Sequence, residues 1–176
     1  MVAKKKASGR SSAKVEVEAA GSPQSAAERR AAEAELSSLV EKHAPEHQKL
    51  FAAMRKSLQK RLPAAHEIAY EYANQGAVVV SYSPNEHGYN GVLAIRCSAD
   101  GVKLYFTQGK DLPDPEKLLK GSSQTRWIAV EGASTLTRPA VAKLVDEAIA
   151  RTSAPFAADG RGSVIIQSTS AKKKRG

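Results

Sequence analysis

The sequence contains one cysteine, Cys97, and few aromatic side chains, which make up 5% of its 176 residues. A lone cysteine excludes an internal disulfide, and no spacing of Cys and His resembles a zinc site. No apolar run approaches the roughly 18 residues that a membrane-spanning helix needs. Lysines near the N-terminus precede no apolar stretch. We therefore expect no secretory signal, no membrane partner and a cytoplasmic location.

Signatures of catalysis are also missing from the sequence. It contains no nucleophile elbow, phosphate-binding P-loop or dinucleotide fingerprint. The loop at 85–91 gathers Glu86, His87 and Tyr89, and His87 could act as an acid or base near neutral pH. The turn-forming Asn and Gly residues of this loop are a simpler explanation for it. We therefore expect a binding domain rather than an enzyme, and the residues indicate no particular cofactor.

The formal net charge is +9, and most of the excess lies at the two ends of the chain. Basic clusters of this kind bind nucleic acid through counterion release, with little sequence preference. Alternatively, they are solubilising tails of an abundant bacterial protein. The candidate nucleic-acid contacts are Lys4, Lys5, Lys6, Lys172, Lys173, Lys174 and Arg175.

Composition divides the chain into four segments. Residues 1–24 lack apolar periodicity and predict a disordered basic N-terminal tail. Residues 25–44 predict a surface helix that begins with a capping box. Residues 45–151 carry the main apolar pattern and predict one α+β domain. Residues 152–176 predict a flexible basic C-terminal tail.

Local signals predict the elements of the central domain. A helix beginning at Pro45 places apolar residues at every fourth position from Leu50 to Leu62. Alternating or β-branched runs then predict strands. The expected strands are 66–72, 77–82, 92–97, 102–106 and 126–130, with an optional edge strand at 164–166, and the expected later helices are 114–121, capped by Asp114, and a long one capped by Thr137. Short connections favour a small antiparallel β-sheet packed by flanking α-helices, an α+β fold.

Two segments give the chain a resemblance to a known family. The run from Gly109 to Gly121, followed by Thr125 to Ile128, resembles the C-terminal half of YdhG-like domains, and the helix from Leu50 to Leu62 resembles their first half. These are domains of unknown function, and one member is described as a frataxin-like iron chaperone. The resemblance covers roughly residues 45–151 and implies the same α+β architecture. It also raises intracellular iron binding as an alternative function, although this stretch has fourteen basic and eleven acidic residues, a net charge of +3.

Polar residues around the expected short helix are candidates for a ligand surface. An Arg fork among hydroxyl groups can bind phosphate or carboxylate, and we expect a pocket between this helix and the loop at 87–90. The candidate residues are His87, Tyr89, Asn90, Lys110, Lys120 and Arg126. Trp127 is predicted to lie in the core or at its edge. The linear sequence shows no aromatic–basic interleaving typical of an RNA-binding sheet.

These observations predict a non-enzymatic domain that binds a small ligand or a partner. Nucleic-acid association through the basic tails and intracellular iron binding are the alternatives. Asp111, Asp114 and Glu116 lie close in sequence and could ligate a hard cation, but helix capping explains two of the three, so we expect no metal site there.

Overall fold

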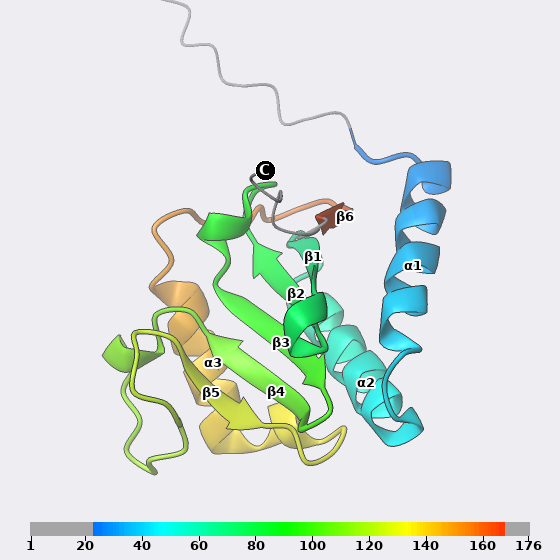
Figure 1. Cartoon of the computed structure of the whole chain (residues 1–176). Coiled ribbons are helices and arrows are strands. Elements are labelled where there is room, and N and C mark those ends of the chain that lie inside the picture. The colour runs from blue at the N-terminus through cyan, green and yellow to red at the C-terminus, as the bar shows by residue number, and fades with distance from the viewer. Residues whose placement is uncertain (1–22, 168–176) are drawn as a thin grey trace, which may run out of the picture.

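The computed structural model describes residues 23–167, apart from the side chain of Tyr89. This part of the chain forms a six-stranded sheet with three α-helices (Figure 1). The helices are α1 Ala26–Val40, α2 Pro45–Arg61 and α3 Pro139–Ala150, and the strands are β1 His66–Tyr72, β2 Ala77–Ser83, β3 Leu93–Ser98, β4 Gly101–Phe106, β5 Arg126–Ala129 and β6 Val164–Gln167.

The sheet has the strand order β5-β4-β3-β2-β1-β6. Every neighbouring pair from β5 to β1 is antiparallel, and only β6 runs parallel to its neighbour β1. Because β1 to β4 follow one another through short turns, they form a meander in chain order. The predicted α+β class is confirmed, and the optional edge strand near residue 164 is present.

The first two helices begin where the sequence signals placed them. The side chain of Ser25 accepts a hydrogen bond from the Glu28 backbone, and the Glu28 carboxylate accepts one from the Ser25 backbone, which completes the capping box. Pro45 occupies the first turn of α2. The buried sides of the two helices carry Leu36, Leu39, Phe51, Met54 and Leu58.

The core lies between the helices and one face of the sheet, which we call the inner face. In Figure 1, α2 and α3 lie behind the sheet and cover this face. Alternate residues of each strand point into the core, so that Val102, Leu104 and Phe106 of β4 are buried while the residues between them are half-buried. The helices cover only one side, so the opposite face of the sheet carries different side chains.

Two predicted details near the C-terminal half are wrong. Residues 114–121 form no helix: Asp114 does accept hydrogen bonds from the Leu118 and Leu119 backbone, but Lys117 has a left-handed φ of 53° and Lys120 pairs with Trp127 as a β-bridge. Pairing with β5 therefore uses backbone groups that a helix would have needed. Thr137 does not cap α3, since it ends a short 3₁₀ turn and Arg138 precedes the helix.

Segments near the two ends of the described chain lie together at the β1 edge. The side-chain amide of Gln24 donates to the Val164 carbonyl at 2.8 Å and accepts from the Val164 backbone at 3.0 Å. Arg29 of α1 donates to the Gly162 carbonyl at 2.7 Å. Residues 152–167 thus end in a strand whose Val164 is buried. Among the described residues, no helix combines the length and apolarity needed to cross a bilayer.

Candidate functional site

The sheet face opposite the helices, which we call the outer face, presents two rows of side chains across the strands. One row runs from Tyr70 of β1 through Val79 and Arg96 to Lys103 of β4. The second row runs through Ser81, Ala94, Tyr105 and Trp127. Register fixes both rows, because residues paired across strands project to the same side of the sheet.

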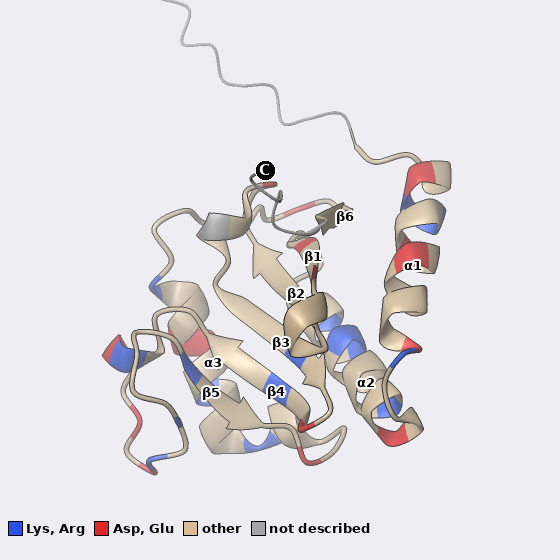
Figure 2. Cartoon of the chain, in the orientation of Figure 1, with Lys and Arg blue, Asp and Glu red and all other residues tan. Residues whose placement is uncertain are grey.

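At its strand positions, the outer face carries positively charged residues and no acidic ones. Strands β2 to β5 contain no Asp or Glu, and in Figure 2 they carry blue segments and no red ones. The two acids of β1, Glu67 and Glu71, pair with Tyr82 and Val78 and so point to the inner face. The electrostatic potential over the outer face is therefore set by cations.

Two of these cations occupy paired positions on neighbouring strands. Arg96 of β3 and Lys103 of β4 are cross-strand partners and both are half-buried. Arg96 donates a 3.3 Å hydrogen bond to the neutral side chain of Gln75. The ammonium group of Lys103 instead lies over Trp127 of β5, so the two charges extend toward opposite edges of the sheet. An anion bound on this face could contact either cation.

Trp127 lies on the outer face beside two ammonium groups, those of Lys103 and Lys120. The Nζ of Lys103 is 4.2 Å from the ring centroid, and that of Lys120 is 5.4 Å away. The backbones of Lys120 and Trp127 exchange hydrogen bonds of 2.8 and 3.0 Å, which hold Lys120 at this position. The sequence predicts Trp127 in the core or at its edge. The structure places its half-buried ring outside the core, on the side of the sheet away from the helices.

A second aromatic group lies at the β1 end of the same face. The rings of Tyr70 and Tyr72 stack with centroids 6.2 Å apart. The loop at Gly88 packs so closely on the Tyr70 hydroxyl that a side chain at Gly88 would overlap it. Burial raises the pKa of Tyr70, so its hydroxyl stays protonated at neutral pH.

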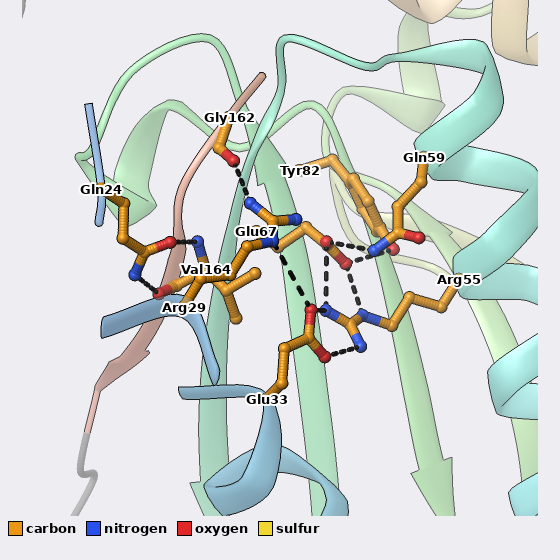
Figure 3. A network of polar contacts seen from close by, with 9 residues as sticks. All are labelled: Gln24, Arg29, Glu33, Arg55, Gln59, Glu67, Tyr82, Gly162 and Val164. Carbon is orange, nitrogen blue, oxygen red and sulfur yellow. Dashed lines mark hydrogen bonds and ion pairs between the residues drawn. The ribbon is translucent and has the colours of Figure 1, made fainter. Parts of the chain in front are cut away.

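The inner face instead holds a buried polar network around Glu67 (Figure 3). The Glu67 carboxylate is almost fully buried and accepts four hydrogen bonds: from Arg55 at 2.7 and 3.2 Å, from Gln59 at 2.6 Å and from the Tyr82 hydroxyl at 3.1 Å. Arg55 also donates to Glu33 of α1 at 2.6 and 2.8 Å. One guanidinium therefore joins α1, α2 and β1.

The network is arranged to hold charges in place. Burial alone would lower the pKa of Arg55, but its hydrogen bonds to Glu33 and Glu67 raise it above the usual value. The hydrogen bond from Arg55 lowers the pKa of Glu33. Because both Glu67 oxygens are already occupied by donors, this carboxylate has little capacity left to accept a substrate proton. We assign the network to stability.

The candidate ligand residues lie in two separate places. Arg126 donates to the carbonyl groups of Ser123 and Gly121 at 2.6 Å each, so its guanidinium closes the loop before β5. Lys120 lies beside Trp127, and Lys110 is exposed and pairs through its backbone with Gln124. These three residues lie around the 107–125 loop.

Of the candidates in the loop after β2, Asn90 lies at a cavity that the 107–125 loop also borders, although Lys110, Lys120 and Arg126 do not line it. Asn90 donates to the Asn85 side chain at 3.2 Å and lines a cavity of about 400 Å³ together with Gln108, Asp111 and Arg151. His87 is exposed, and the side chain of Tyr89 lies outside the described residues. Arg151 is bound to the Asp111 carbonyl at 2.9 Å and to Glu147 at 3.2 Å, so the one cation of this cavity already has partners.

A second cavity of about 470 Å³ lies between α1, α2 and the β1–β2 turn. It is lined by His43, His47 and Glu71, among others, and Glu71 is held by Lys42 at 2.9 Å. Burial lowers the pKa of His43, as do the neighbouring His47 and Lys42. Across residues 23–167, no group of three His, Cys, Asp or Glu is suited to hold a metal ion.

The outer-face residues Arg96, Lys103 and Tyr105 were not candidates from the sequence. The alternation in β4 separated Lys103 and Tyr105 from the core side, but only the strand register brings Trp127 beside them. The predicted tail contacts (Lys4, Lys5, Lys6, Lys172, Lys173, Lys174 and Arg175) lie outside the described residues. Comparison with known proteins finds no match to any family model, curated protein or solved structure.

Proposed function

We propose that this chain is a non-enzymatic binding domain for nucleic acid, and that the outer face of its sheet is the contact surface. The observation that carries the proposal is the direct cross-strand pairing of Arg96 with Lys103 on a face whose strands present no carboxylate. Phosphates along a bound strand could accept charged hydrogen bonds from Lys103 and from Arg96 at separate points of this face.

The net charge and its distribution support the same partner. The chain carries +9, and its basic tails add non-specific attraction to any polyanion. Contacts of Arg and Lys with phosphates position a nucleic acid without reading its sequence. The cavity near Asn90 is less suited to bind a small anion. Its Arg151 already has hydrogen-bond partners, and the C-terminal end of α3, which is the negative end of the helix dipole, lies there.

Membership of the YdhG-like family is proposed separately, on the residues from Gly109 to Gly121 and from Thr125 to Ile128. Nucleic-acid binding by the outer face does not depend on membership of this family.

Binding of a labelled oligonucleotide, followed by fluorescence anisotropy between about 50 and 200 mM salt, tests the proposal. The double variant Arg96→Ala/Lys103→Ala should bind roughly tenfold more weakly. The slope of log K against log salt should become shallower by about 1.4, because each phosphate contact to a single strand contributes about 0.7. The matched control is Lys49→Ala/Lys56→Ala, which removes the same charge from the exposed side of α2.

Equal losses in the two double variants would show that only net charge matters and would overturn the proposal. A full-length variant with the seven candidate tail contacts, Lys4 to Lys6 and Lys172 to Arg175, changed to serine measures the contribution of the tails. Binding that vanishes in this variant and is unchanged in Arg96→Ala/Lys103→Ala would likewise move the function to the tails.

A further inference from the structure

Planar rings lie on either side of two cations across the outer face. Trp127 and Tyr105 are direct cross-strand partners on β5 and β4. Arg96 and Lys103 follow toward the centre of the sheet, and the stacked pair Tyr70 and Tyr72 lies on β1. Because strands are about 4.8 Å apart, β5 and β1 are separated by about 19 Å, which accommodates a few nucleotides.

The small side chain of Ala94 leaves the face low beside Tyr105, its partner on β4. Beyond Ala94, Ser81 is buried under the loop at Gly91, so the open part of the face lies over β3 to β5. In Figure 1, the helices lie behind the sheet, and the turn at residues 73–76, whose Gln75 accepts a hydrogen bond from Arg96, lies in front of it toward β1 and β2. A planar group resting on Tyr105 would therefore meet only Ala94 directly across on β3.

From this layout we infer that the preferred ligand is a single strand of RNA or DNA, with a base stacked on Trp127 and the following phosphates at Lys103 and Arg96. The inference rests on the function proposed above and specifies its substrate class. Bases stack on aromatic side chains only when they are unpaired, and a duplex hides their faces inside the helix. The flat sheet also offers no projecting helix or ribbon that could enter a major groove.

The lysines now beside the indole ring fit this inference. An ammonium over a solvent-accessible ring is a weak contact, weaker than a stacked base. When a base takes the ring, Lys103 and Lys120 are displaced toward the phosphates that arrive with it, where an ammonium forms a stronger charged contact. The cations thus cover the ring in the free protein and pair with the backbone of the bound strand.

Trp127 is the only tryptophan of the chain, so its fluorescence reports on this contact alone. The full-length protein is titrated with a 12-nucleotide oligo(dT), with oligo(U) of equal length, with a duplex of equal length and with inorganic polyphosphate. We expect both single strands to quench the fluorescence and to bind at least tenfold more tightly than the duplex and polyphosphate. A difference between oligo(U) and oligo(dT) would identify the natural strand as RNA or DNA.

Both Trp127 variants lack the fluorophore, so their binding is measured by the anisotropy of labelled strands, with polyphosphate as an unlabelled competitor. Trp127→Leu should weaken single-strand binding about tenfold, Trp127→Phe should keep most of it because stacking survives, and neither should change polyphosphate binding. A melting curve for each variant checks that it is folded. If Trp127→Leu matches the wild type and duplex binds as well as single strand, while Arg96→Ala/Lys103→Ala weakens both, then stacking is refuted and the proposed function stands. If no polymer binds at low salt, both are refuted.

Discussion

Arg55 and Glu67 are joined by two hydrogen bonds of 2.7 and 3.2 Å beneath the inner face of the sheet. The side chain of Glu67 is only 4% exposed, and that of Arg55 is 15% exposed, so this is an ion pair largely removed from water. Arg55 also forms an ion pair with a second carboxylate, that of Glu33 in α1. Arg55 therefore links α1 to β1 through ion pairs with Glu33 and Glu67.

Removing one partner of this buried pair should be strongly destabilising. Arg55→Ala leaves Glu67 charged and without its main donor, and we expect a loss of about 3–5 kcal/mol in the free energy of unfolding. Urea unfolding followed by circular dichroism measures it. Arg61→Ala, which breaks an exposed pair with Asp146, should cost less than about 1 kcal/mol. Similar losses in the two variants would contradict the assignment of the network to stability.

The stability of the fold should depend on pH through Glu33. Its pKa is lowered in the folded protein, chiefly by the hydrogen bond from Arg55. The contribution of Glu33 is therefore complete above its unfolded pKa of about 4.3 and is lost as pH falls through the lower folded value. Between about pH 6 and pH 3, the wild type should lose more stability than Glu33→Gln. Parallel pH profiles would show that Glu33 is not linked to folding.

Gly162 should tolerate no side chain. A Cβ at this position would overlap the carbonyl group of Ala65, where the chain enters β6 beside β1. Gly162→Ala should thus push these segments apart and cost about 1–3 kcal/mol. Gly132, around which a Cβ meets only open space, gives the matched control, and Gly132→Ala should stay within about 1 kcal/mol of the wild type. Thermal unfolding compares the two, and a neutral Gly162→Ala would contradict the close approach.

The single thiol should be inert in the folded protein. Cys97 is fully buried in β3, and burial raises its pKa to about 11. The reactive species is the thiolate, so a disulfide reagent at about pH 8 should label the native protein slowly and the urea-unfolded protein at once. Cys97→Ala/Ala99→Cys moves the thiol to an exposed position and should react rapidly while folded. Immediate labelling of the native wild type would mean that β3 opens readily.

Much of the fold follows from local sequence. Ser25 and Glu28 mark the start of α1, Pro45 marks the start of α2, and β-branched or alternating runs mark the strands. The failure at residues 114–121 is instructive, because Asp114 does bind backbone N–H groups as a cap would. Capping chemistry stabilises a turn as well as a helix. Whether the turn continues was decided by pairing of Lys120 with Trp127.

The residues that meet on the outer face could not be identified from local sequence signals in the same way. Lys103 and Trp127 are 24 positions apart, and each has an ordinary explanation by itself. Their contact depends on the register of β4 with β5, which is a tertiary property. Glu67 shows the same limit: strand alternation grouped it with Glu71, but its burial depends on Arg55 from another element.

The hydrogen bonds between Gln24 and Val164 place the entry and exit of the folded chain side by side. The order of the elements along the chain can therefore be changed without changing their arrangement in space. A circular permutant that joins residue 167 to residue 23 through a short glycine linker, and opens the chain at the exposed turn of residues 73–76, would keep every strand beside its present neighbour.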